Sequence, residues 1–494
     1  MKTQLITASM LYNLSYCPHR LYLDLYGDQK QKDPVSPFVQ LLWERGALHE
    51  REVIGQADLA YTDLSSFSGR ARQEATLLAM IRGDSLIYSG RIQVDDLLGI
   101  PDLLKKNENG NGYLAGDIKS GAALEHGPDP EGRLKDHYAV QLALYTDILE
   151  RLHLSAGRMP FIWDVHGDHV TYELDKPQGN KNRKTWWNLY EETLTSARNI
   201  INRTSATRPA ASGNCKNCEW FSHCMRDLRQ SGDLTLIPRL GRSKRDCLCS
   251  LIPSIQHMAQ GRPESYIDGS KTVFKGIGAD TLSVFFERAR LLVNPEAKPY
   301  LKSAIRFPDA DRELFYDVET DPFTETCYLH GFVERKHKTG EERYIAFMVG
   351  TPSPEAEEKA FSEAWNFIRE SQPCALYAYS KYERTALRKL AGRFPDVTSM
   401  HAVDELFSAK NTIDLYEIVE KHTEWPVTDH SIKTLAKYLG FHWRDAHPSG
   451  AASIEWYHRW LETKSGKLKR RILNYNEDDC RAMLVLLEGI KKLG

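Results

Sequence analysis

The chain has 494 residues and a formal net charge of −2, which predicts two to four globular domains and no global basic field. Any contact with nucleic acid therefore depends on local patches of positive charge. No apolar run is long enough to span a bilayer and no signal-peptide pattern follows Met1, so we expect a cytoplasmic protein without membrane contact. In that compartment nine cysteines argue against a disulfide framework and make clustered thiols candidates for metal binding.

Two helical segments are predicted at the start of the chain. The first, residues 6–27, contains Cys17, which taken alone is most simply a small buried residue. The second, residues 38–54, contains His49, which taken alone is an ordinary surface or core histidine. Neither side chain predicts a site until it is considered together with residues further along the chain.

A hairpin of strands is predicted to bring acidic residues together. Residues 85–94 and 97–104 are expected to be strands, and Asp102 lies near the end of the second. A turn-rich stretch leads into a third strand with Asp117 and Lys119, which point the same way because strand side chains alternate between faces. The hairpin should place both carboxylates at one end of a sheet, where they can hold a divalent metal beside the lysine.

Residues 134–153 form the clearest predicted helix of the first half. An amphipathic helix accounts for its leucine and isoleucine residues. It does not account for Gln141 and Tyr145, which are four apart and therefore share a face beside the apolar stripe.

Three cysteines within ten residues are a specific metal signal: Cys215, Cys218 and Cys224. The fourth ligand is open at this point. His223 would complete a local zinc site, whereas Cys17 would supply the fourth thiolate of an iron–sulfur cluster. Thiolates suit both metals, so ligand softness does not separate them.

These motifs, in this order, resemble the iron–sulfur branch of RecB-type PD-(D/E)xK nucleases, which includes the AddB-type nuclease domain and the CRISPR-associated exonucleases. The resemblance covers roughly residues 1–230. It implies a restriction-endonuclease-like domain in which one or two Mg²⁺ or Mn²⁺ ions are held by His49, Asp102, Asp117 and the Ile118 carbonyl. Lys119 would orient or activate the attacking water, and Gln141 and Tyr145 would position the substrate and the lysine. A 4Fe-4S cluster would join the two ends of the domain through Cys17, Cys215, Cys218 and Cys224.

Residues 231–305 predict a small helical linker. Gly276 and Gly278 resemble the hairpin of a helix-hairpin-helix element, in which backbone N–H groups meet a DNA phosphate. A plain glycine-rich turn between short packed helices explains them equally well.

The second half begins with an apolar strand that carries Asp317 and Glu319 on one face. A purely structural strand would rarely place two acids together beside an apolar run. Glu383 follows a later strand, and Tyr475 and Asp479 share one face of the terminal helix because they are four apart.

This pattern resembles the tyrosine subclass of DEDD-type 3′–5′ exonucleases on an RNase H-like fold, over residues 306–494. The resemblance implies that two Mg²⁺ ions are held by Asp317, Glu319 and Asp479. Tyr475 would orient the attacking water. Glu383 stands where an aspartate is usual, and Asp414 is the reserve candidate for that position.

The expected protein is thus an α/β multidomain chain with a restriction-endonuclease-like domain at 1–230, a helical linker at 231–305 and an RNase H-like domain at 306–494. We expect a metal-dependent DNA nuclease that hydrolyses single-stranded or end-containing DNA in repair, recombination or defence against foreign DNA. The alternatives are a nuclease with one working site whose second domain guides strands, an RNA-processing exonuclease, and a non-catalytic adaptor.

Partners follow from the same expectations. A basic run at residues 464–471 either tracks the nucleic-acid backbone or forms a solvated loop. No P-loop pattern is present, so any unwinding would come from a helicase or from another repair or defence protein.

Overall fold

The computed structural model describes residues 4–56, 60–108, 110–125, 133–165, 167–179 and 183–493. The chain divides into two compact units: Met1–Pro209 with Gly213–Cys224, and Ala210–Ser212 with Met225–Gly494. The predicted linker at 231–305 therefore groups with the second unit. Within the described ranges, no helix combines the length and the apolarity that a bilayer crossing requires.

The first unit contains one larger and two smaller sheets in its described part. The larger sheet has the spatial order β11 (His169–Thr171), β10 (Phe161–Trp163), β7 (Tyr113–Ile118), β6 (Leu103–Lys106), β3 (Leu86–Tyr88) and β2 (Thr62–Asp63). The smaller sheets are β1 (Ile6–Thr7), β5 (Leu97–Gly99) and β4 (Ile92–Val94), and the pair β8 (Leu124–Glu125) and β9 (Arg133–Leu134). Strands β6 and β7 form the predicted antiparallel hairpin, and β10 runs parallel to β7.

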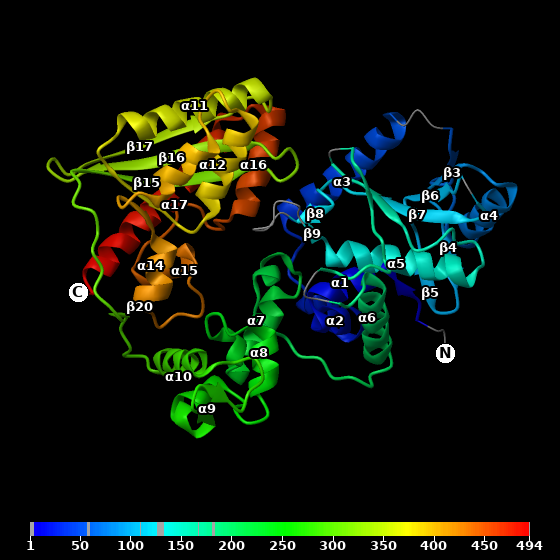
Figure 1. Ribbon diagram of the computed structural model, residues 1–494, viewed down its shortest axis with the longest axis horizontal. Coiled ribbons are helices and arrows are strands. Elements are labelled where there is room, and N and C mark those ends of the chain that lie inside the picture. Colours follow the sequence, from blue (N-terminus) through cyan, green and yellow to red (C-terminus); the bar gives the residue numbers. More distant parts are fainter. Residues whose placement is uncertain are drawn as a thin grey trace. The chain divides into compact units, whose positions relative to one another are not determined.

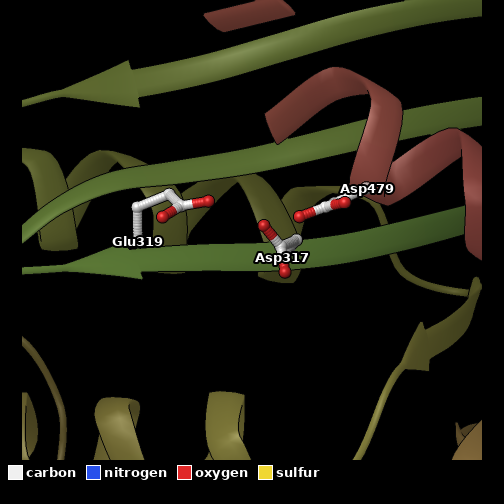
Figure 2. A group of neighbouring side chains, drawn as sticks. All are labelled: Asp317, Glu319 and Asp479. Carbon is white, nitrogen blue, oxygen red and sulfur yellow. The ribbon is translucent and has the colours of Figure 1, made fainter. Parts of the chain in front are cut away.

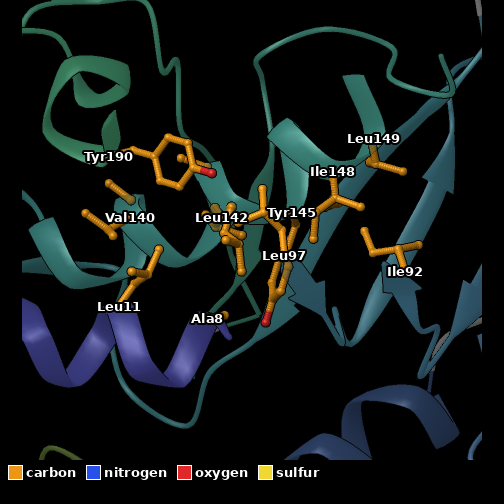
Figure 3. Packing of buried hydrophobic residues seen from close by; sticks show 14 of the residues in the cluster. Ala8, Leu11, Ile92, Leu97, Val140, Leu142, Tyr145, Ile148, Leu149 and Tyr190 are labelled. Carbon is orange, nitrogen blue, oxygen red and sulfur yellow. The ribbon is translucent and has the colours of Figure 1, made fainter. Parts of the chain in front are cut away.

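Helices pack around the sheets of this unit and on one another (Figure 1). They are α1 (Ala8–Tyr16), α2 (Pro18–Tyr26), α3 (Pro37–Gln56), α4 (Gly69–Arg82), α5 (Asp136–Arg151) and α6 (Trp186–Ile201). Tyr113 and Ala115 of β7 join the core cluster of α1, α5 and α6, part of which Figure 3 shows. Leu114 of the same strand faces the other way, toward a cluster that contains Ile54 of α3. The alternation along β7 thus gives each face of the sheet its own core.

The structure corrects two predicted strands and one predicted helix. The segment 85–94 breaks at Ser89, whose φ is +61°, so β3 joins the larger sheet and β4 a smaller one. The segment 97–104 breaks at Pro101, which has no N–H to donate to a ladder, so β5 and β6 also lie in different sheets. The helix expected at 6–27 is two helices that meet at Cys17, because Pro18 suits only the first turn of a helix.

The second unit begins with short helices around their own core cluster. The described elements are α7 (Phe221–Ser231), which starts in the first unit, α8 (Gly241–Leu248), α9 (Ile255–Gln260), the hairpin β12 (Ile267–Asp268) and β13 (Lys271–Thr272), and α10 (Ala279–Val293). Gly276 and Gly278 lie between the β12–β13 hairpin and α10. A hairpin of strands therefore precedes this turn, which corrects the helix-hairpin-helix expectation and leaves the glycine-rich turn.

A buried ion pair ties this helical part to the rest of the second unit. Arg288 of α10 donates to both carboxylate oxygens of Glu424, at 3.0 and 3.1 Å, and both residues are buried. Glu424 belongs to β20 (Thr423–Glu424), which pairs with β14 (Tyr300–Leu301). Removing one partner of such a pair leaves a buried charge uncompensated, so the contact fixes the position of α10.

A five-stranded sheet forms the centre of the second unit. Its described strands are, in order, β17 (Glu341–Met348), β16 (Cys327–Lys336), β15 (Arg312–Thr320), β18 (Ala375–Ala378) and β19 (Thr412–Asp414). The first three form an antiparallel meander, and β18 and β19 run parallel to β15. The remaining helices are α11 (Pro354–Glu370), α12 (Tyr382–Arg393), α13 (Met400–Ser408), α14 (Leu415–His422), α15 (Ile432–Tyr438), α16 (Gly450–Thr463) and α17 (Gly466–Lys491).

The alternation of β15 divides the helices between two faces of this sheet. Leu314, Tyr316 and Val318 pack in the cluster of α11, α12 and α13. Phe315 points to the opposite face and packs in the cluster of α14, α15 and α17. Figure 1 shows α11 and α17 on opposite sides of the sheet. Polar residues at odd positions of β15 therefore face α17.

Candidate active sites

Three carboxylates converge where β15 faces α17. Asp317 and Glu319 follow Phe315 at odd positions of the strand, and Asp479 comes from the helix (Figure 2). One oxygen atom of each residue lies within 4.8 Å of the other two. Among the histidine, cysteine, aspartate and glutamate side chains that the structure describes, this is the sole trio so close together.

The trio lines a cavity of about 290 Å³. Its other walls are mostly aromatic and aliphatic and include Tyr379, Tyr382, Ile432, Ile454, Tyr475 and Met483. Glu383, in the first turn of α12, also lines the cavity, and its Oε2 atom is buried without a hydrogen-bond partner. A buried, unsatisfied carboxylate oxygen is costly unless a cation or a donor occupies the space beside it.

Burial and mutual repulsion perturb every carboxylate of this cavity. Burial, followed by the charges of Asp479 and Glu319, raises the pKa of Asp317 well above its usual value. Burial and the charge of Asp479 raise the pKa of Glu319 to about 8. Burial also raises the pKa of Glu383 to about 8 and that of Asp479 above its usual value. Such crowded acids suit a divalent cation with oxygen ligands, whose charge offsets their repulsion.

Two neighbours fix the orientation of the trio. The side-chain amide of Asn476 donates to Asp317 Oδ2 at 2.7 Å, and the indole N–H of Trp443 donates to Asp479 Oδ1 at 2.7 Å. Asn476 fits against β16 only because residue 331 is glycine: a Cβ atom on Gly331 would lie 1.5 Å from Asn476 Oδ1. The sequence offered no signal for these supports, because each acts across more than thirty positions of the chain.

Tyr475 is buried beside the acids and is in contact with a lysine. Lys433 Nζ, from α15, donates to the Tyr475 hydroxyl at 2.8 Å and lies 3.7 Å from Asp479 Oδ1. Burial and the charge of Asp479 raise the pKa of Tyr475 well above its usual value, so the hydroxyl stays protonated. The tyrosine was predicted and the lysine was not.

Asp414, the reserve candidate, has another role. Its Oδ1 atom accepts from the backbone N–H groups of Ser380 at 2.8 Å and Tyr416 at 2.9 Å, which caps α14. It is not among the cavity-lining residues. The capping bonds engage one oxygen of this carboxylate, whereas Glu383 lines the cavity and is the better candidate for the position.

In the first unit, the β6–β7 hairpin joins the predicted acids and lysine. The N–H of Ile118 donates to Asp102 Oδ2 at 2.8 Å, and the N–H of Asp102 approaches Asp117 Oδ1 at 3.4 Å. Lys119 Nζ lies 2.8 Å from Asp117 Oδ2, which confirms that these two side chains share a face. Burial and the Asp117 charge raise the pKa of Asp102 to about 8. Burial alone would lower the pKa of Lys119, but Asp117 and Asp102 raise it above its usual value.

His49 is the third predicted side-chain ligand of this hairpin site. Its Nε2 atom is buried without a hydrogen-bond partner, as expected of a metal ligand. Nevertheless, within the described residues the ligand atoms of His49, Asp102 and Asp117 are not all within 4.8 Å of one another. The adjacent Glu50 accepts from the Tyr88 hydroxyl at 2.8 Å, and its charge further raises the pKa of Asp102. Sequence reasoning missed Glu50, which carries no motif.

The polar pair of α5 faces the same site. Gln141 Nε2 donates to the Tyr145 hydroxyl at 3.3 Å, so the two residues share a face as predicted. Burial, Asp117 and Asp102 raise the pKa of Tyr145 well above its usual value, which places the phenol near both acids. Tyr138, not predicted, lies with its ring centroid 5.5 Å from Lys119 Nζ.

The structure brings the two cysteine-bearing segments together within the first unit. The backbone N–H of Asp33 donates to Glu219 O at 2.6 Å, and the indole N–H of Trp220 donates to Asp24 at 2.9 Å. Cys17, Cys215, Cys218 and Cys224 are all partly exposed and none forms a disulfide. Burial raises the pKa of the Cys218 thiol, and the nearby Cys17 and Cys215 thiols raise it further. Cys17 therefore lies near Cys218, a member of the distant triplet.

A family model of the RNase H superfamily matches residues 314–490, which cover the five-stranded sheet and helices α11 to α17 almost entirely. No curated protein matches the chain. The chain is thus a mixed α/β multidomain protein with an RNase H-like domain in its C-terminal region. Such a domain suggests a nuclease, which implies nucleic-acid binding, and RNase H-like domains use Mg²⁺ or Mn²⁺.

Proposed function

We propose that the protein is a divalent-metal-dependent DNA nuclease with two hydrolytic sites. The observation that supports this most strongly is the cavity in the RNase H-like domain. Four carboxylates line it, three of them are buried, and none of the lining residues is a lysine, an arginine or a histidine. A binding surface for a polyanion has no use for such a cluster of acids, whereas phosphodiester hydrolysis does.

Mg²⁺ or Mn²⁺ would be held in this cavity by Asp317, Glu319, Glu383 and Asp479. When bound, the metal neutralises charge on the scissile phosphate and lowers the pKa of the attacking water. Tyr475, kept protonated, orients that water through its hydroxyl. The aromatic and aliphatic walls, among them Tyr379, Tyr382 and Ile454, exclude bulk water and offer surfaces for a terminal base. Cleavage from a free strand end is the mode that we propose for this site.

The second hydrolytic site is proposed in the first unit, as a restriction-endonuclease-like domain over residues 1–230. His49, Asp102, Asp117 and the Ile118 carbonyl would hold its metal. Lys119 orients the attacking water and offsets charge on the phosphate, while Gln141 and Tyr145 position the substrate and the lysine. The raised pKa of Asp102 beside Asp117 supports this assignment, because two carboxylates crowd one place there too.

Cys17, Cys215, Cys218 and Cys224 are proposed to hold a 4Fe-4S cluster that joins the ends of this unit. Thiolates suit both metals, so Zn²⁺ is the alternative at this site.

We place the substrate among single-stranded DNA and DNA ends, in cytoplasmic repair, recombination or defence against foreign DNA, with unwinding supplied by a helicase partner. The RNase H-like domain alone does not distinguish DNA from RNA, and a guiding role for either unit is the competing function.

The test uses full-length, cluster-intact protein with Mg²⁺ or Mn²⁺ and single strands of DNA or RNA labelled at either end. We expect Asp117→Asn and Asp317→Asn each to remove part of the DNA products and the double variant to remove all of them. Cleavage that survives in the double variant contradicts the proposal. A single variant without effect assigns a guiding role to its unit, and faster cleavage of RNA assigns the RNA-processing function.

A further inference from the structure

Beside two residues that line the cavity of the RNase H-like domain, Tyr475 and Asp479, lies a lysine that no family resemblance assigned. Lys433 lies at the second position of α15, directly after the cavity-lining Ile432. Its ammonium donates to the Tyr475 hydroxyl at 2.8 Å, lies 4.9 Å from the centroid of the same ring and 3.7 Å from Asp479 Oδ1. The Lys433 ammonium thus contacts both the phenol of Tyr475 and the carboxylate of Asp479.

The surroundings of Lys433 restrain it further. Its side chain is 28 % exposed, and its ammonium lies 5.8 Å from the ring centroid of Trp443, whose indole holds Asp479. An ammonium offers three donors and no acceptor, so the Tyr475 oxygen accepts from it and the phenol O–H is directed elsewhere. The direction of that O–H decides where a hydroxyl can hold a water molecule.

We propose that Lys433 is a positioning residue for the hydrolytic reaction, which holds the Tyr475 hydroxyl in the orientation required to align the attacking water. The inference rests on the proposed function, since it assigns a role within that reaction. Lys433 acts through Tyr475 and offsets part of the charge of the acids. It does not serve as a phosphate-binding residue, because the ammonium is already engaged by the phenol and Asp479.

The central experiment is a double-mutant cycle between Lys433→Met and Tyr475→Phe on end-labelled single-stranded DNA, in an Asp117→Asn background that isolates the second site. We expect Lys433→Met to lower kcat by about 10- to 100-fold and to change KM by less than about 2-fold. In the Tyr475→Phe background, the same substitution should lower kcat by less than about 2-fold, because the hydroxyl that it positions is already gone. Lys433→Arg, which keeps the charge and the donors, should recover at least part of kcat.

A control variant and measurements of strand affinity and thermal unfolding distinguish positioning of Tyr475 from phosphate binding and from loss of the fold. Lys437→Met, one turn along α15 at an exposed position, is the matched control and should leave kcat unchanged. Strand affinity, measured in an Asp317→Asn background that prevents cleavage, should be the same with and without Lys433→Met. Thermal unfolding of each variant shows whether the fold is retained.

The inference is overturned if an active, Asp317-dependent enzyme loses nothing on Lys433→Met, or if the losses from Lys433→Met and Tyr475→Phe multiply. A tenfold loss of strand affinity on Lys433→Met would also overturn it, because the lysine would then bind phosphate. Absence of any Asp317-dependent cleavage in the parent protein instead contradicts the proposed function itself.

Discussion

The side-chain amide of Asn476 donates to Asp317 Oδ2 at 2.7 Å across 159 positions of the chain. Asp317 belongs to the strand β15 and Asn476 to the terminal helix α17, so this bond aligns the two halves of the carboxylate cavity. The same helix brings Tyr475 and Asp479 to the cavity. The geometry of the site therefore depends on how closely α17 packs against the sheet.

The glycine that permits this packing gives the first prediction. A methyl group on Gly331 would overlap Asn476 Oδ1, so Gly331→Ala should push Asn476 away from Asp317. We expect a loss of about 1–3 kcal/mol in the free energy of unfolding and a drop in kcat of at least about 10-fold. Urea unfolding and strand cleavage measure the two effects. Gly350→Ala is the control, because open space surrounds that position, and equal effects of both substitutions would contradict the packing explanation.

The second prediction concerns Glu383. Its buried, unpartnered Oε2 atom indicates a metal ligand, so Glu383→Gln should lower cleavage by about 100-fold. It should also reduce the rise in Tm that Mn²⁺ gives over EDTA, because less metal binding means less stabilisation of the folded state. Calorimetry of the Asp117→Asn protein with each additive isolates this site. The exposed Glu405→Gln should change neither quantity, and an undiminished Tm rise in Glu383→Gln would exclude the residue as a ligand.

A third prediction follows from the position of Cys17. Purified protein should be brown with visible absorbance, and Cys17→Ser should remove the colour and most of the iron. Absorbance and metal analysis of anaerobically prepared protein measure this. The exposed Cys247→Ser should keep both. Equimolar zinc in a colourless protein, unchanged by Cys17→Ser, would instead assign the site to zinc with His223.

The fourth prediction is a dependence of stability on pH that lies away from the metal sites. Burial alone would raise the pKa of Glu420, but hydrogen bonds from His430 at 2.9 Å and Arg239 at 2.8 Å lower it from 4.5 to about 2. A carboxylate with a lowered pKa in the folded state contributes its stability fully above the unfolded pKa and loses it as the pH falls through the folded one. The contribution, roughly 2–3 kcal/mol, should therefore disappear between pH 4.5 and pH 2.

Glu420→Gln tests this window. Above about pH 5 the variant should be less stable than the parent protein in urea, and the difference should shrink steadily toward about pH 2. The matched control is Glu417→Gln on the same helix, whose ion pair with Lys421 is half exposed and contributes little. A difference between Glu420→Gln and the parent that stays constant with pH would contradict the assigned cause.

Local periodicity predicted the parts of both sites that lie within one element. Asp117 with Lys119, Asp317 with Glu319, and Tyr475 with Asp479 follow from the repeat of a strand or a helix, and the structure places each pair on one face. Such spacing is fixed by backbone geometry alone, so it can be predicted without knowledge of the remaining chain.

The missed and misassigned features depend on contacts distant in sequence. The strand predicted at 85–94 breaks at Ser89, and after the break the hydroxyl of Thr76, on α4, accepts the N–H of Arg91. Lys433 reaches Tyr475 only through the packing of α15 on α17. Asp414 was taken for a reserve ligand because its capping role becomes visible only once the start of α14 is known.

Tyr475, Asn476 and Asp479 all lie within little more than one turn of α17. The site should therefore be sensitive to insertions and deletions in this helix as well as to substitutions. Each residue added to an α-helix turns everything beyond it by about 100°. A single insertion between Asn476 and Asp479 would carry the aspartate out of the cavity while every side chain of the site remained in the sequence. The turn at residues 337–340 between β16 and β17, by contrast, can change in length without altering this angular phase. In this domain the number of residues along the last helix determines the arrangement of the carboxylate cavity as much as their identity does.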